Sequence, residues 1–140
     1  MIPTETRSGQ AAATLDQRRA AHAWEVIQRA KQKQGDHARQ DPKKFGGQAK
    51  KLPTRIMAAG LGQALAFLKA KGYAPGLLAE LTDWVGVRIQ IKPDGAKELL
   101  ERIVKGDSDF LRRATDEVLA YLTWLNRFAE AEGLTDGDDS

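Results

Sequence analysis

A broad apolar stripe near the C-terminus, in residues 108–132, restricts the fold more than any other feature of this chain. Its apolar side chains recur at helical spacing, and they cover a wider part of the helix circumference than the narrow seam of a coiled coil. They are Phe110, Leu111, Ala114, Val118, Leu119, Tyr121, Leu122, Trp124, Leu125, Phe128 and Ala129. A single neighbouring helix cannot cover a stripe of this width. We therefore expect either that this helix is central in the domain or that one side of it contacts another protein.

Start and stop signals upstream of this segment predict further helices. Residues 14–17 (Thr-Leu-Asp-Gln) have the form of a capping box, which satisfies two backbone amides at a helix start. Asp41-Pro42 is a second start signal, Leu52-Pro53-Thr54 marks a break, and the glycines at 72 and 106 end helices. The predicted helices cover residues 14–33, 42–51, 53–71, 77–85, 94–105 and 107–132.

Residues 85–91 are the one ambiguous segment. Val85, Val87, Ile89 and Ile91 alternate with small or polar residues, as strands do. Because no second run in the chain could pair with it, we expect an extended connector that lies on the core; an edge offered to another subunit is the alternative. The chain therefore predicts an all-α fold, a single-domain bundle of five to six helices with one short extended connector.

The length of 140 residues is that of one ordinary domain. We expect residues 14–132 to form the helical domain, residues 1–13 to be a disordered N-terminal tail, and residues 133–140 to be an acidic disordered tail. The sequence has no run of about 18 apolar residues and no apolar N-terminal segment of the signal-peptide type. The expected location is therefore the cytoplasm, with no membrane partner.

The composition leaves little material for catalysis or for a metal centre. The chain has no cysteine and two histidines, His22 and His37, so disulfides, thiol nucleophiles and thiolate metal sites are excluded. Both histidines are expected on the surface, and the common nucleotide, hydrolase and calcium-loop motifs are absent. We predict that the chain is not an enzyme and has no catalytic residue, metal, cofactor or small-molecule substrate.

Several residues that could suggest chemistry have simpler structural interpretations. Asp107 and Asp109 stand at a predicted helix start, where acidic side chains cap backbone amides. The charged residues of 97–105 are expected to form a solvated face. Gly60 and Gly62 lie within a predicted apolar helix, and we expect them to permit close packing against a neighbouring helix.

Charge is divided unevenly along the chain. Residues 1–60 hold twelve Lys and Arg against five Asp and Glu, a net charge of +7, whereas residues 61–140 hold ten against fourteen, a net charge of −4. Between residues 29 and 55, nine cations stand against two acidic residues. This asymmetry indicates an anionic partner for one face of the protein.

Two lysine pairs and an arginine are the candidate contacts for that partner: Lys43, Lys44, Lys50, Lys51 and Arg55. Gly46 and Gly47 leave no side-chain bulk between the pairs, so a phosphate backbone could approach, and the expected binding is insensitive to sequence. Phe45 could stack on a base, but a core position is the expected one. An ordinary solvated face is the alternative interpretation of these lysines.

Taken in order, the segments of this chain resemble a known family. A basic and aromatic first helix (residues 15–24) leads to a basic segment and Leu52-Pro53, then to the run Ile56–Phe67, and finally to the run Thr115–Ala131, which contains Trp-Leu-Asn-Arg-Phe. Over about residues 14–132 this order is similar to that of the small all-helical subunit of the type III-B CRISPR effector, the Cmr complex.

The resemblance implies an assembly function. Small subunits of this family stack on copies of themselves beside a filament that carries the guide RNA, and their basic face helps to hold the target RNA paired to the guide. Cleavage belongs to other subunits. The positions in this sequence that would face RNA are Lys43, Lys44, Lys50, Lys51, Arg55, Arg18 and Arg19. The acidic second half would contact positive surfaces of other Cmr subunits.

Two other functions are compatible with the same residues. One is a free-standing helical adaptor, whose broad C-terminal stripe binds a partner protein and whose lysines only confer solubility. The other is a small regulator that binds nucleic acid, such as DNA, without sequence specificity. The salt dependence of binding and the preferred type of strand distinguish these functions from an RNA-backbone contact.

Overall fold

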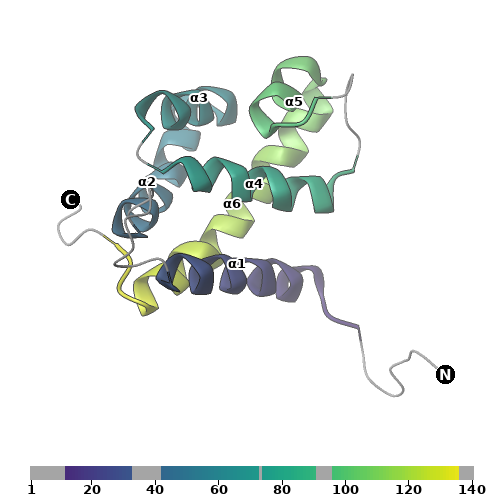
Figure 1. Ribbon diagram of the computed structural model, residues 1–140. Coiled ribbons are helices and arrows are strands. Elements are labelled where there is room, and N and C mark those ends of the chain that lie inside the picture. Colours follow the sequence, from purple (N-terminus) through teal and green to yellow (C-terminus); the bar gives the residue numbers. More distant parts are fainter. Residues whose placement is uncertain (1–11, 33–41, 73, 91–95, 136–140) are drawn as a thin grey trace.

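Six helices make up the regular structure of the described residues, 12–32, 42–72, 74–90 and 96–135, in a computed structural model, and no strand occurs among them (Figure 1). The all-α prediction is confirmed. None of these helices has both the length and the apolar content needed to cross a membrane. The helices are α1 Leu15–Gln32, α2 Pro42–Ala59, α3 Leu61–Lys71, α4 Pro75–Arg88, α5 Leu99–Lys105 and α6 Ser108–Ala131.

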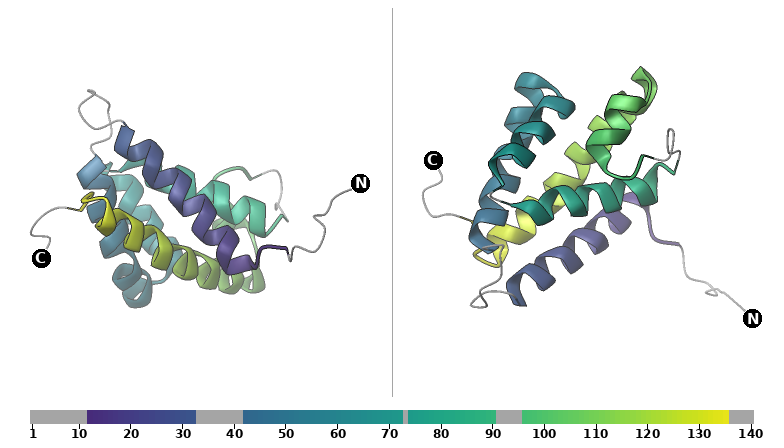
Figure 2. Two further views of the ribbon diagram at one scale, coloured as in Figure 1. Left: turned by 90° about the horizontal axis from the view of Figure 1, so that it is seen from below. Right: turned by 45° about the horizontal axis from the view of Figure 1, so that its top comes forward.

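The long C-terminal helix α6 is central to the packing. It runs diagonally across the molecule, with α1 and α4 on one side of it (Figures 1 and 2), and it contacts α1, α2 and α4. Helix α3 packs on α2, α4 and α5. Most of the stripe predicted from the sequence is therefore covered within the domain, although Leu111 is exposed, and the expected central position of this helix is confirmed. Its fully buried members are Ala114, Val118, Tyr121, Leu122, Leu125 and Ala129.

The predicted starts of α1 and α6 are confirmed by their side-chain caps. The Thr14 amide donates to Gln17 Oε1 at 2.8 Å, and the Gln17 amide donates to Thr14 Oγ1 at 3.0 Å, which is the reciprocal pattern of a capping box. At the start of α6, Asp107 Oδ1 accepts from the Phe110 amide at 2.9 Å. Both ends are fixed by short-range contacts that the sequence encodes locally.

The predicted break at Leu52-Pro53 is wrong, because α2 continues through Pro53 to Ala59. Proline removes one backbone donor from the helix, but Leu52 and Ile56 on either side of it are buried and hold the helix on the core. The chain turns instead at Gly60, whose φ of +91° is strained for any residue with a side chain. A Cβ at Gly60 would meet nothing within 4 Å, so this glycine serves conformation and not the close packing that the sequence suggested.

The extended connector predicted for residues 85–91 is mostly helix. Helix α4 continues to Arg88, and extended backbone begins at Ile89; Ile91 lies outside the described residues. Ile89 is buried, and its carbonyl accepts a hydrogen bond of 2.7 Å from Nη2 of Arg102. This contact satisfies backbone that the end of α4 leaves without a helical partner. Arg102 is thus buried, contrary to the solvated face expected for it, because its guanidinium supports the end of α4.

Packing extends beyond residue 132, where the acidic tail was expected to begin. Leu134 is fully buried, and its amide donates to the Ala129 carbonyl at 2.8 Å. The backbone of Leu134 lies directly against Gly46 of α2: a Cβ built at Gly46 would stand 1.7 Å from the Leu134 carbonyl oxygen. Only glycine permits this approach between α2 and the end of α6.

We predict opposite effects for alanine at two helical glycines. Gly46→Ala forces the backbone of Leu134 to move and should lower the free energy of unfolding by about 1–3 kcal/mol. Gly62→Ala places its Cβ 3.6 Å from Ile103 Cγ2, an ordinary contact, and should raise it by roughly 0.5–1 kcal/mol because alanine is the better helix former. Urea unfolding of both variants measures the difference; equal losses would contradict the assignment of Gly46 to close approach.

Candidate functional site

The cations predicted on α2 lie in two adjoining rows along the helix. Lys43 and Lys50 are seven residues apart, nearly two full turns, and form one row; Lys44, Lys51 and Arg55 form the other, about 100° around the helix. Lys43, Lys44 and Lys50 are exposed, and Lys51 and Arg55 are half-buried. The structure therefore brings these five residues together on one side of α2, opposite the face that enters the core.

Arg55 is held in place by contacts with Gln48 and Phe67. Its Nη1 donates to Gln48 Oε1 at 2.7 Å, and its guanidinium carbon lies 4.5 Å from the centre of the Phe67 ring on α3. The arginine thus borders a shallow apolar pocket of about 280 Å³ between α2 and α3, whose other lining residues are Ala58, Ala59, Gln63, Ala64 and Phe67. A guanidinium held by an amide and an aromatic face loses mobility.

The residues between the lysine pairs do not have the open character that the sequence suggested. Phe45 is 1% exposed, which confirms its expected core position and leaves it unable to stack on a base. Gly46 and Gly47 are both buried, and Gly46 lies against Leu134. The expectation that these glycines leave room for a phosphate backbone is therefore wrong, because other parts of the protein occupy that room. An approaching anion would meet the lysine side chains themselves.

Arg18 and Arg19 are not brought beside the α2 cations. They lie in the first turn of α1, and α2 lies near the opposite end of that helix (Figures 1 and 2). Eighteen residues of helix span about 27 Å, so the two groups are separated by most of the length of α1. Arg18 is exposed, whereas the guanidinium of Arg19 is turned into the protein.

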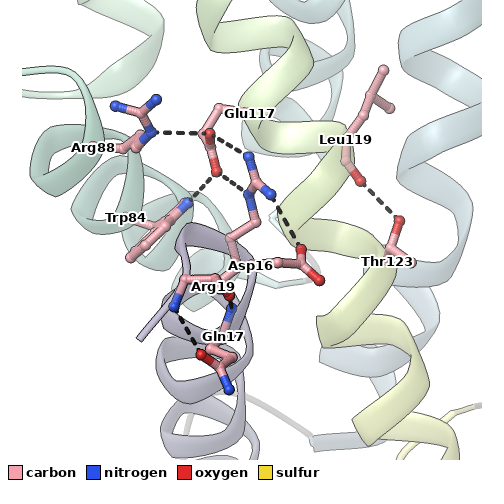
Figure 3. A network of polar contacts seen from close by, with 9 residues as sticks. Asp16, Gln17, Arg19, Trp84, Arg88, Glu117, Leu119 and Thr123 are labelled. Atoms are coloured by element: carbon pink, nitrogen blue, oxygen red, sulfur yellow. Dashed lines mark hydrogen bonds and ion pairs between the residues drawn. The ribbon is translucent and has the colours of Figure 1, made fainter. Parts of the chain in front are cut away.

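Glu117 of α6 is the partner of Arg19 and the centre of a polar network (Figure 3). Arg19 donates through Nε to Oε2 at 2.6 Å and through Nη2 to Oε1 at 3.0 Å. Trp84 Nε1 of α4 donates to Oε2 at 2.8 Å, and Arg88 Nε lies 3.5 Å from Oε1. Asp16 completes the network by accepting from Arg19 Nη1 at 3.1 Å. One buried carboxylate thereby joins α1, α4 and α6.

These contacts keep Glu117 ionised although it is only 5% exposed. Burial by itself would raise the pKa of Glu117, but the hydrogen bonds from Arg19 and Trp84 and the positive charges of Arg19 and Arg88 hold that pKa below its ordinary value. The hydrogen bond to Glu117 raises the pKa of Arg19 in turn. The charges of this network satisfy one another, so its role in the protein is to orient helices.

Glu117 was not among the residues predicted from the sequence, and His22 is more buried than the sequence predicts. The signal for Glu117 was an acidic residue on the apolar stripe of α6, three residues after Ala114 and four before Tyr121. His22 was expected on the surface, but its side chain is 16% exposed. Its Nδ1 lies 2.6 Å from the Tyr121 hydroxyl and its Nε2 lies 2.7 Å from Asp83 Oδ2. His37 lies outside the described residues.

The acidic residues at the start of α6 have structural partners. Asp107 is the cap described above, as predicted. Asp109 accepts from Arg112 Nη2 at 2.6 Å, and both side chains are exposed. Asp107 therefore acts as a helix cap, and Asp109 forms a surface ion pair. A metal-dependent nuclease would instead need carboxylates that converge on one point.

Comparison with known proteins places this helical chain in a family. The family described as CRISPR-associated protein (Cas_Cmr5) matches residues 15–132, nearly the whole helical domain. This chain belongs to the Cmr5 family. One curated member, the "CRISPR system Cmr subunit Cmr5" of Thermus thermophilus, is 32% identical over 114 residues, which cover 80% of this chain and 90% of that protein. The family resemblance drawn from the sequence is confirmed.

The buried carboxylate of this Cmr5-family chain predicts a large effect of its removal. Glu117→Ala leaves Arg19 and Trp84 without their acceptor and should lower the free energy of unfolding by about 3–5 kcal/mol. The matched control is Glu130→Ala, which removes an exposed carboxylate of the same helix that pairs with Arg127 at 3.2 Å and should cost less than about 1 kcal/mol. Urea unfolding measures the free energy of unfolding of both variants. Similar decreases in the two would show that the Glu117 network stabilises the fold no more than an exposed ion pair does.

The lowered pKa of Glu117 also predicts how this contribution depends on pH. A carboxyl group whose pKa is lower in the folded than in the unfolded protein stabilises the fold above its unfolded pKa, about 4.3 for Glu, and loses that contribution as the pH falls through its folded value. The stability difference between the wild-type chain and Glu117→Gln should therefore be constant from pH 7 to about pH 5 and shrink below about pH 4. A difference that grows on acidification would contradict this account.

Proposed function

We propose that this chain is a non-catalytic structural subunit of a cytoplasmic Cmr CRISPR effector and that it contacts RNA through the basic side of α2. Membership of the Cmr5 family supports the assembly role, because the Thermus relative is described as a Cmr subunit. The two rows of cations on α2 support the RNA contact: they gather five positive side chains on one face without a recognition element for bases. Such a surface binds phosphate backbones irrespective of sequence.

The α2 surface is the main part of the proposed contact, and the start of α1 is a separate second part. Lys43, Lys44, Lys50, Lys51 and Arg55 share one helix and one side. Arg18 is exposed at the far end of α1. Arg19 stands beside it, but its guanidinium already binds Glu117 and Asp16, so Arg18 carries more of this second contact. The two parts are far enough apart to meet different phosphates of the guide–target RNA.

Assembly compensates for the small number of phosphates that one chain can reach. Five cations that bind the phosphates of a single strand give a slope of log K against log salt of roughly −3.5. So few phosphate contacts give only a modest affinity at physiological salt. Copies of the chain stacked along the guide–target RNA would add their contacts, since linked sites bind with a high effective concentration. In this proposal the acidic second half, net −4, faces basic surfaces of neighbouring copies and of other Cmr subunits.

The adaptor hypothesis has lost its main support. It rested on the apolar stripe of α6 being too broad for one partner helix, and α1, α2 and α4 pack on α6 and bury most of that stripe, while Leu111 is exposed. The proposal of an RNA-contacting subunit instead accounts for the gathered cations on α2.

Charge reversal on α2 tests the RNA contact directly. Replacing Lys43, Lys44, Lys50 and Lys51 together by Glu should weaken target-RNA binding of the reconstituted Cmr complex by at least about tenfold at moderate salt and flatten its salt dependence. The control variant reverses four exposed cations outside α1 and α2: Lys97, Lys105, Arg112 and Arg127. Filter binding at several salt concentrations gives both affinities and slopes.

The result divides the proposal into its two claims. Equal affinities for the two quadruple variants would overturn the assignment of the RNA contact to α2. Failure of the wild-type chain to enter the complex with the other subunits, measured by co-purification, would overturn the assembly role. A DNA strand bound as tightly as RNA by the isolated chain would favour the regulator hypothesis.

A further inference from the structure

Three potential metal ligands converge between α1 and α4, away from the basic side of α2. They are His22 of α1 and Glu80 and Asp83 of α4, and one ligand atom of each lies within 4.8 Å of the others. Glu80 and Asp83 are three residues apart, so both point to the same side of α4. The proposed RNA contact uses none of these three residues.

His22 is oriented as a metal ligand is. Its ring packs against Trp84, with the ring centres 5.4 Å apart, and its Nδ1 lies 2.6 Å from the hydroxyl of the buried Tyr121. These contacts fix the imidazole plane and direct Nε2 toward Asp83, whose Oδ2 lies 2.7 Å away. Metal-binding histidines typically have their second nitrogen held by such an outer partner, which sets the tautomer and the ring orientation.

The donor set selects the class of ion. One imidazole nitrogen and two carboxylates suit Zn²⁺ and similar transition-metal ions, whereas Mg²⁺ and Ca²⁺ prefer oxygen ligands throughout. Ligands around a tetrahedral Zn²⁺ lie about 3.4 Å from one another, so small side-chain rotations bring the three groups to the required spacing. The Asp83 side chain is 64% exposed, which leaves a path for the ion and a position for water.

We propose that His22, Glu80 and Asp83 bind one divalent transition-metal ion, of the Zn²⁺ class, that links α1 to α4. On binding, His22 Nε2 gives up its hydrogen-bond contact with Asp83, Nδ1 carries the imidazole proton, and the Tyr121 oxygen accepts from it. The ion also replaces Arg29, whose Nη1 donates to Glu80 Oε2 at 3.0 Å. These contacts compete with the metal, so the site takes up and releases the ion as its concentration changes.

Two isosteric variants test the site without disturbing the fold. Asp83→Asn still accepts a hydrogen bond from His22, and Glu80→Gln still accepts one from Arg29, but neutral amides are poor ligands for Zn²⁺. Asp116→Asn removes an exposed carboxylate of α6 outside the cluster, and His37→Asn removes the other histidine. All are prepared as tag-free full chains and measured by calorimetry with Zn²⁺ alone, with Co²⁺ absorption as the spectroscopic readout of nitrogen and oxygen ligation.

The expected result is one Zn²⁺ per wild-type chain and a rise of its thermal midpoint with Zn²⁺, because a ligand that binds only the folded state stabilises it. Asp83→Asn and Glu80→Gln should each bind at least tenfold more weakly, with unchanged midpoints in the absence of metal, while Asp116→Asn and His37→Asn bind as the wild type does. No Zn²⁺ binding by the wild type, full binding by both α4 variants, or loss of binding in His37→Asn alone would each overturn the proposal. None of these outcomes bears on the RNA contact of α2, so the two proposals fail independently.

Discussion

The carboxylate of Glu117 is the contact on which the arrangement of three helices depends. A buried ion costs several kcal/mol unless its lone pairs are met by well-placed donors. Glu117 meets this requirement with Arg19 from α1 and with Trp84 and Arg88 from α4. Apolar packing on the broad stripe of α6 would tolerate a range of positions for α1 and α4, since it is not directional. The donors of Glu117 favour the one register in which they reach a single carboxylate.

One turn further along α6, Tyr121 also contacts both α1 and α4, through its hydroxyl and its aromatic ring. Its hydroxyl bonds to His22, one turn after Arg19 on α1, and its ring stacks on Trp84 with the centres 5.7 Å apart. Consecutive turns of α6 therefore contact consecutive turns of α1. The two helices run in the same general direction (Figure 1). Because two adjacent polar contacts must be satisfied together, a slip of α1 by one turn would break both. These two contacts, Arg19 with Glu117 and His22 with Tyr121, explain why the polar side of α1, expected to face water, is half-buried at His22.

Local signals in the sequence predicted much of the fold, and contacts between distant residues account for what was missed. The capping box at Thr14 and the cap at Asp107 act within three residues, so the starts of α1 and α6 are visible in the sequence. Pro53 predicts a break because its missing backbone donor is evident in the sequence, whereas the burial of Leu52 and Ile56 that outweighs this loss is not. Glu117 and Arg19 are 98 positions apart, so nothing near either residue identifies its partner. The five α2 cations were predicted from the concentration of charge between residues 29 and 55, and they share one side of a helix because α2 continues through Pro53.

Three arginines have structural roles within the fold for a physical reason. Arg19, Arg55 and Arg102 are held by a carboxylate, an amide and a backbone carbonyl, where a planar guanidinium with several fixed donors has an advantage. The exposed cations of α2 are lysines, and a flexible point charge would suit the proposed contact with a phosphate backbone, which offers no fixed geometry. The net charge of +7 in residues 1–60 therefore overstates the charge presented to a partner, since arginines such as Arg19 are neutralised within the fold. In the proposed RNA contact, the lysines of α2 therefore matter more than the total charge of this half of the chain.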